Sequence, residues 1–158
     1  MQFAGTSRSI KPRLGPLLAT LVLLSVGACG GDDPVGVEAT ASDLLGTWDI
    51  TSLTFTSVPA GSSAELVSQG FSGEITFRQD GTYTLTTTDP GQAVEVEDGT
   101  FTVSGSTLSL IVPGEVSALT IQALTSTAAT LFQADDEYDF NDDGTETPAT
   151  VTVVLAKQ

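Results

Sequence analysis

Apolar side chains recur at every second position from about residue 46 onward, in short runs separated by Gly, Pro, Ser and Asp. In the stretch "EITFRQDGTYTL", Ile75 and Phe77 share one face of a strand, and Tyr83 and Leu85 share one face of the next. An Asp-Gly pair lies between them, at residues 80–81. Alternation around such a pair is typical of a β-hairpin, because the turn needs a positive φ that Gly adopts freely.

The same pattern recurs along the chain and indicates an all-β domain. "TFTVSGSTLSLIV" places a Ser-Gly turn at residues 104–105. Adjacent Leu131 and Phe132 leave the phase of the seventh strand open, and "AELVSQ" in the long first loop predicts one helical turn. The predicted strands lie near residues 46–57, 71–79, 82–88, 93–104, 107–112, 117–124, 128–139 and 147–156. Eight antiparallel strands joined by short turns close most simply into an up-and-down barrel, which removes exposed strand edges.

The N-terminal segment has a different pattern. Arg8, Lys11 and Arg13 precede an apolar run of 13 residues, "LGPLLATLVLLSV". A positive region followed by a short apolar run is typical of a secretory signal peptide. The run is too short for a transmembrane helix, which needs about 20 apolar residues. We therefore expect residues 1–28 to be an export signal.

The apolar run leads directly into "VGAC", residues 26–29, which contains the only cysteine of the chain. This stretch resembles the lipobox of bacterial lipoproteins. The resemblance implies that Cys29 receives a diacylglyceryl group, becomes the N-terminus after cleavage and anchors the protein to a membrane of the cell envelope. Stable anchoring takes about two lipid signals, which one multiply acylated cysteine provides. Because Gly30 rather than Asp follows the cysteine, the resemblance favours the outer membrane and leaves the facing side open.

Residues 29–43, rich in Gly, Asp, Ala and Thr, lack apolar periodicity and predict a flexible tether before one domain at 44–158. Removing residues 1–28 takes away three basic residues and no acid, so the net charge changes from −15 to −18. Such a charge excludes nucleic acid as a partner, because nucleic-acid binding needs clustered Lys and Arg. It can attract a basic protein, although acidic charge also serves solubility.

The first predicted strand contains a Gly-x-Trp motif, formed by Gly46 and Trp48. With the hairpins "ITFRQDGTYTL" and "GTFTVSGSTLSL", this motif resembles the small lipocalin-like domains of bacterial lipoproteins, from about Leu44 to Lys157. The resemblance implies that the indole of Trp48 plugs the closed end of the barrel and that Lys157 covers it through a cation–π contact. It also implies a protein that binds or carries a small apolar ligand.

The interior of such a barrel allows two alternatives, and both stay open at this point. Eight strands enclose a space just wide enough either to be filled by side chains or to hold one small ligand. The side chains that can fill it are aromatic: Trp48, Phe55, Phe77, Tyr83 and Phe101.

The residue types argue against an enzyme. The chain contains no histidine, its single cysteine is assigned to lipid, and it has no Gly-x-Ser-x-Gly motif. The usual pairs of nucleophile and base are therefore missing. Glu95 and Glu97 share one face of a strand, but Val94 and Val96 are expected to face inward, which places both glutamates in solvent.

The most acidic stretch is "DDEYDFNDDGTE", residues 135–146, with seven acids in twelve positions. Asp139, Asn141, Asp143 and the following glycine match the start of a calcium loop, in which alternate oxygen side chains converge on one ion. Glu146 can supply a further carboxylate. Two interpretations remain: a Ca²⁺ site, and a hairpin tip whose acids are solvated. No other cofactor is expected.

The sequence therefore predicts a non-enzymatic, lipid-anchored envelope protein whose lipocalin-like barrel binds or carries a small apolar ligand. The alternative is a protein-interaction module, such as an inhibitor of a basic envelope hydrolase, favoured by the acidic charge. Both place the protein in the cell envelope, anchored through Cys29.

Overall fold

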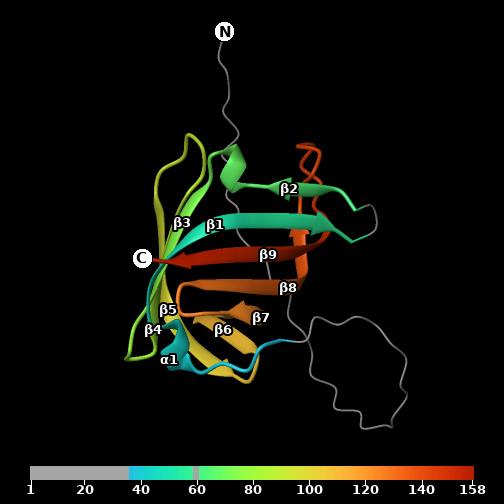
Figure 1. The fold of residues 1–158 in the computed structure, drawn as a ribbon. Coiled ribbons are helices and arrows are strands. Elements are labelled where there is room, and N and C mark those ends of the chain that lie inside the picture. The colour runs from blue at the N-terminus through green and yellow to red at the C-terminus, as the bar shows by residue number, and fades with distance from the viewer. Residues whose placement is uncertain (1–35, 59–60) are drawn as a thin grey trace, which may run out of the picture.

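The structure, a computed structural model, describes residues 36–58 and 61–158, so the predicted signal peptide and Cys29 lie outside the described residues. The described part is nearly all β (Figure 1). Its elements are α1 (Ala41–Leu44), β1 (Gly46–Ser57), β2 (Ser63–Glu65), the 3₁₀ helix η1 (Val67–Gln69), β3 (Ser72–Phe77), β4 (Thr82–Thr88), β5 (Glu95–Ser104), β6 (Thr107–Val112), β7 (Glu115–Leu124), β8 (Ala128–Tyr138) and β9 (Thr147–Lys157). None of these helices is long and apolar enough to cross a membrane.

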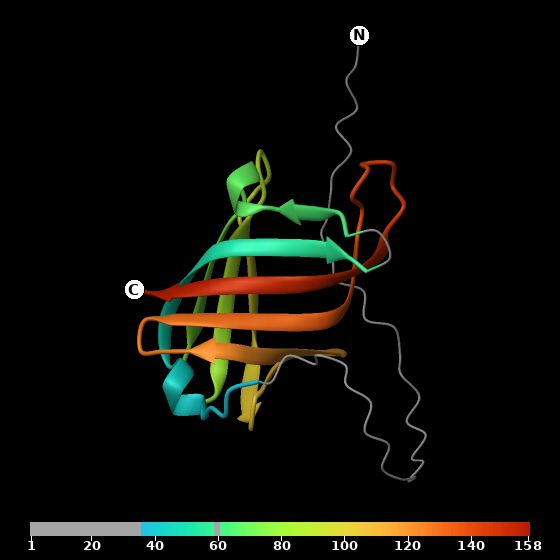
Figure 2. The same ribbon diagram turned by 45° about the vertical axis from the view of Figure 1, so that its right-hand side comes forward.

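Eight strands close into an antiparallel barrel, which confirms the predicted fold. From β3 to β9 each strand pairs with the next, and β1 pairs with both β3 and β9 to complete the ring. The additional short strand, β2, pairs with Thr54–Thr56 at the far end of β1. In Figure 2, β1, β9 and β8 form the near wall, and β3 to β5 cross behind them.

The predicted hairpin turns are present, and they explain where the strands end. Gly81 and Gly105 have φ values of 82° and 59°, in the left-handed region that glycine adopts without strain. Beside the first of these glycines, the Asp80 carboxylate accepts the backbone N–H of Thr82 at 3.0 Å and its hydroxyl at 2.7 Å. Such short turns fix the register of the strands and hence which side chains face inward.

The segment before β1, residues 36–45, packs against the barrel and is called the strap below. The Val37 N–H donates to the Ile121 carbonyl at 2.7 Å, and Leu44 is completely buried. Part of the stretch predicted as a flexible tether, residues 29–43, thus lies on the folded domain. The strap packs there because Leu44, at its end, is buried in the core. Burying a leucine side chain stabilises the packed strap by about 2 kcal/mol.

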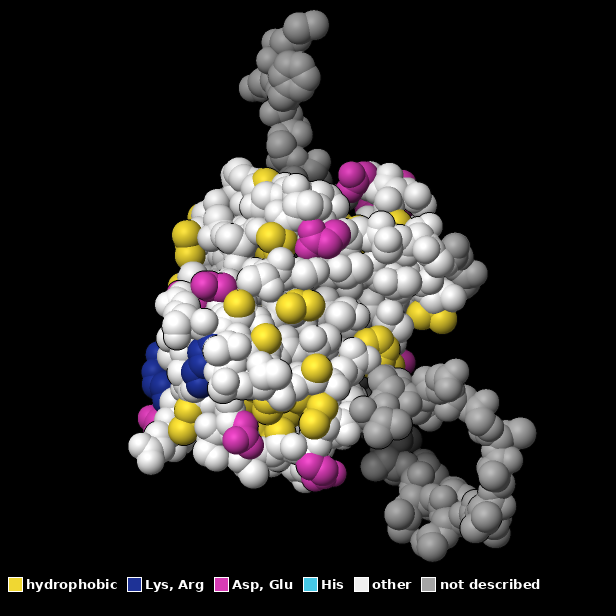
Figure 3. All heavy atoms as spheres, viewed as in Figure 1, with side chains coloured by type: hydrophobic (Ala, Val, Ile, Leu, Met, Phe, Trp, Pro, Cys, Tyr) yellow, Lys and Arg dark blue, Asp and Glu magenta, His cyan; other side chains and the backbone are white. Residues whose placement is uncertain are grey.

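The two ends of the barrel carry different connections. The closed end carries α1 and the short turns β3–β4, β5–β6 and β7–β8, whereas the open end carries the β4–β5, β6–β7 and β8–β9 connections and the chain between β1 and β3. Arg78 and Lys157, the basic residues of the described chain, both lie at the closed end. On the face in Figure 3, dark blue side chains accordingly appear at one edge. Within residues 36–58 and 61–158, the open end therefore has no basic side chain.

Candidate functional site

Trp48 plugs the closed end, as the sequence resemblance implied. Its side chain is completely buried, and its indole N–H donates to the Leu44 carbonyl at 2.7 Å. The Lys157 ammonium lies 5.0 Å from the centre of the ring, within the range of a cation–π contact. This contact follows from strand pairing, because the register places Trp48 of β1 opposite Lys157 of β9.

Aromatic rings fill the closed half of the barrel. The ring centres of Phe77 and Phe101 lie 4.8 Å apart in an edge-on arrangement, and those of Phe77 and Tyr83 lie 6.5 Å apart. Together with Trp48, these are four of the five aromatic residues predicted to fill the interior. Buried aliphatic side chains complete this core: Leu44, Ile75, Leu108, Leu119, Ile121, Ala129, Leu131 and Leu155. The closed half is therefore a packed core.

The fifth aromatic residue, Phe55, belongs to a separate cluster toward the open end. It stacks on Tyr138 with 4.5 Å between ring centres, and Tyr138 meets Phe140 edge-on at 4.9 Å. Leu66 and Phe71, from the connection between β2 and β3, are buried in the same cluster. This connection therefore packs over one side of the open end, where Figure 1 shows η1 above β1 and β3.

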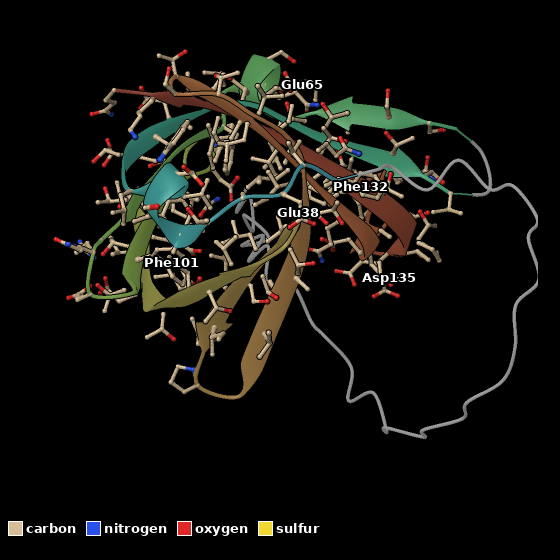
Figure 4. The ribbon with its side chains drawn as sticks, turned by 60° about the horizontal axis from the view of Figure 1, so that its bottom comes forward. Glu38, Glu65, Phe101, Phe132 and Asp135 are labelled. Atoms are coloured by element: carbon tan, nitrogen blue, oxygen red, sulfur yellow. The ribbon has the colours of Figure 1, made fainter. Side chains whose placement is uncertain are left out.

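Glu65 fixes this connection by accepting hydrogen bonds from the backbone. Its carboxylate accepts the N–H of Ser68 at 2.6 Å and the N–H groups of Leu53 and Val67 at 3.2 Å each. The bond from Ser68, supported by those from Leu53 and Val67, lowers the pKa of Glu65 to about 2. The charged carboxylate thus ties η1 to β1, and Figure 4 shows Glu65 beside this helix.

On β4 and β6, the inner-facing apolar residues toward the open end are only partly buried. On β6, Leu108 is completely buried, whereas Leu110 and Val112 on the same face stay partly exposed. Leu85 on β4 is partly exposed too, although Tyr83 on the same face is buried. Exposure thus increases along these strands toward the open end. We call the surface of Leu85, Leu110 and Val112 the cup.

The rim of the cup is acidic, and here one sequence prediction was wrong. Val94 and Val96, predicted to face inward, are 60% and 61% exposed. The buried residue Phe101 sets the phase of β5, so Glu95 and Glu97, which lie at odd positions like Phe101, share its inner face. Both glutamates stay exposed because this part of β5 lies at the mouth. Strand alternation, taken backward from Phe101, would have predicted that Glu95 and Glu97 face inward.

Tyr83 connects the packed core with this rim. Its ring lies opposite Gly99 in the β4–β5 pair, and a side chain at Gly99 would collide with the ring. The hydroxyl of Tyr83 donates to Glu97 at 2.6 Å. Burial, followed by the bond and charge of Glu97 and the charge of Glu115, raises the pKa of Tyr83. The hydroxyl therefore stays protonated and continues to donate.

Strands β7 and β8 add further polar residues to the rim, which the sequence prediction did not include. Glu115 lies opposite Val112, and Asp136 lies opposite the buried Ala149, so both face inward. Burial raises the pKa of Asp136, whose carboxylate accepts the Gln133 side-chain amide at 3.3 Å. A register shift between Gln133 and Asp136 obscures this orientation in the sequence pattern. In Figure 4, the label of Asp135 marks this part of β8.

The acidic hairpin between β8 and β9 brings Asp139, Asn141, Asp143 and Glu146 into one loop region. The Asp139 carboxylate accepts the backbone N–H groups of Asn141 at 3.1 Å, Asp143 at 3.3 Å and Gly144 at 2.8 Å. Within the described residues, no three His, Cys, Asp or Glu side chains gather as metal ligands. Asp139 thus organises the turn, and calcium binding at this hairpin stays a prediction.

The sequence model of the lipocalin-like domain family matches residues 44–132, more than half of the chain. Among solved structures, the chain is similar to insecticyanin from the tobacco hornworm Manduca sexta, with 13% identity and a TM-score of 0.51 over 84% of this chain and 70% of that one. It is also similar to a lipocalin-like protein from Bacteroides uniformis, with 13% identity and a TM-score of 0.48 over 73% and 99% of the two chains. No curated protein matches the sequence. The family match and the closed eight-stranded barrel show that the chain belongs to the lipocalin-like domain family.

Proposed function

We propose that the protein binds and carries one small apolar ligand in the cup of Leu85, Leu110 and Val112. The observation that carries this proposal is the contrast along β6, where Leu108 is completely buried and Leu110 is not. Apolar surface that a ligand removes from water contributes about 25 cal/mol per Å². The closed half offers no such surface because aromatic rings fill it.

The rim selects the polar group of the ligand. Glu97, Glu115 and Asp136 place carboxylate oxygens, which accept hydrogen bonds, at the rim, and the described open end has no basic side chain. A ligand that carries a carboxylate would meet like charges there and would lose its own hydration. The ligand class that fits is therefore an apolar molecule whose polar end is neutral and donates hydrogen bonds, or is cationic.

A bulky residue in the cup tests this proposal directly. We expect Leu110→Trp to fill the cup and to reduce binding of N-phenylnaphthylamine, an uncharged apolar dye, by about tenfold or more. Ser109→Trp adds the same ring to the opposite face of β6 and should leave dye binding unchanged. Equal binding by both variants and the original protein would place the dye elsewhere and refute the cup.

We further propose that the protein acts from the bacterial envelope, anchored through lipidated Cys29 and facing either side of the outer membrane. The lipobox resemblance at residues 26–29 supports this location. In cells, Cys29→Ser should abolish the lipid processing of the precursor. A Cys29→Ser protein that is still cleaved after residue 28 and stays with the membrane would contradict the anchor.

A further inference from the structure

Strand β5 has an unpaired edge at the open end. Strand β5 pairs with β6 over Thr100–Ser104 and with β4 over Glu95–Thr100. Its segment Glu95–Gly99 therefore pairs with β4 alone among the described strands. The cause is the early end of β6 at Val112, where Pro113 and Gly114 turn the chain back into β7. The backbone N–H and C=O groups of such an edge are a template for another strand.

The side chains along this edge alternate between apolar and acidic. Val96 is 61% exposed on the outer face, and Val94, just before the strand, is 60% exposed. Glu95 and Glu97 carry negative charge on the inner face. Exposed apolar residues next to acids, on an edge with free backbone groups, combine the features of a strand-addition site.

We propose that this edge, residues 94–99, binds an extended segment of a basic protein in which Lys or Arg alternates with apolar residues. Directly opposed residues of paired strands share a face, so the apolar side chains of the segment contact Val94 and Val96. Its basic side chains then meet Glu95 and Glu97. The proposal rests on the strand edge rather than on the cup, and the two sites share Glu97.

Charge decides between a basic partner and a second copy of this chain. The protein has 20 acidic and five basic residues, and the two basic residues of its described part lie at the closed end. Two copies that paired through this edge would bring their own glutamates together, which is unfavourable for directly opposed like charges. A basic segment instead gains charge complementarity, which also accelerates association.

A peptide titration tests the proposal. The probe is a short blocked peptide of alternating lysine and valine, added to the purified protein while backbone amide shifts are followed by NMR. We expect the shifts to concentrate at residues 94–99. A peptide of the same composition with its lysines grouped at one end should bind at least about fivefold more weakly, because it cannot place valines and lysines on separate faces.

Two matched variants complete the test. Val96→Lys should weaken binding of the alternating peptide by about fivefold or more. It removes the apolar contact with the peptide's valines and adds a positive charge that repels the peptide's lysines. Val58→Lys changes the net charge equally at an exposed position just after β1, and it should leave binding nearly unchanged. Equal loss in both variants, equal binding of both peptides, or self-association of the protein through residues 94–99 would overturn the proposal.

Discussion

The closed and open ends of this barrel are built from the same strands but are finished differently. At the closed end, Trp48, Phe77 and Phe101 interlock, and the strap covers the core with the buried Leu44. At the open end, Leu110 on the inner face stays partly exposed, and Glu97 stands at the mouth. The change occurs within single strands, over two to four residues.

This difference separates stability from binding. A packed core of large apolar side chains supplies most of the free energy of folding, because each fully buried side chain contributes about 1.5–3 kcal/mol. Incompletely buried apolar residues contribute less to folding but keep surface available for a ligand or partner. We therefore expect changes at the closed end to affect folding first, and changes at the open end to affect binding first.

The largest effect is expected at Trp48. Trp48→Ala removes a completely buried ring, its hydrogen bond to Leu44 and its contact with Lys157. We expect the free energy of unfolding to fall by about 3–5 kcal/mol in denaturant titrations. A loss below about 1 kcal/mol would mean that the closed half does not depend on a tight core.

A pair of leucines on β6 compares the two halves with the same substitution. Leu108→Ala, in the closed half, should lower the free energy of unfolding by about 2–5 kcal/mol because it leaves a cavity. Leu110→Ala, in the cup, should lower it by about 1 kcal/mol because solvent already reaches that side chain. Both values come from the same chemical denaturation experiment. Equal losses would remove the distinction between core and cup.

A smaller, pH-dependent effect is expected at Glu65. Its pKa is lowered to about 2 by backbone hydrogen bonds, first of all from Ser68, so the folded state favours the charged carboxylate. The resulting stabilisation is complete above the ordinary pKa of 4.5 and is lost as the pH falls toward 2. Glu65→Gln should therefore be less stable than the original protein at pH 7, and the difference should vanish near pH 2. A difference that is constant with pH would contradict the role of the charge.

The smallest effect is expected at the acidic hairpin. Asp139→Ala removes the acceptor for three backbone N–H groups and should lower the free energy of unfolding by about 1 kcal/mol or less, since water replaces it. If the hairpin also binds Ca²⁺, millimolar Ca²⁺ raises the Tm more than Mg²⁺ does at equal ionic strength. That excess should disappear in Asp139→Ala with Asp143→Ala. Equal shifts from both ions would indicate screening of the acidic charge alone.

The sequence predicted the closed half well because its signals there are local and agree with one another. Alternating apolar residues and the Gly81 and Gly105 turns determine both the strands and their inner faces. The Gly-x-Trp motif correctly implied the contact between Trp48 and Lys157. The sequence left open which of the adjacent residues Leu131 and Phe132 faces inward. The structure shows that Leu131 is buried and Phe132 is not.

The rim of the open half was predicted less well because the residues of β5 there are exposed, so burial does not fix their pattern. Val94 and Val96 alternate as inner-facing residues would, yet they point outward, since no core surrounds that part of β5. The stretch "AELVSQ" forms the end of β2 and then η1, where the predicted helical turn occupies only Val67–Gln69. Its conformation depends on Glu65, whose partner at Leu53 is twelve positions away and invisible to local periodicity.

Methyl NMR provides the most direct test that ligand binding belongs to the open half. With leucine methyl groups labelled, N-phenylnaphthylamine is added stepwise, and the shifts of cup and core leucines are compared. We predict large shifts at Leu85 and Leu110 and small shifts at Leu108 and Leu155, which are buried in the closed half. Shifts of similar size in both halves, or none at Leu85 and Leu110 despite dye binding, would contradict the separation of core and cup.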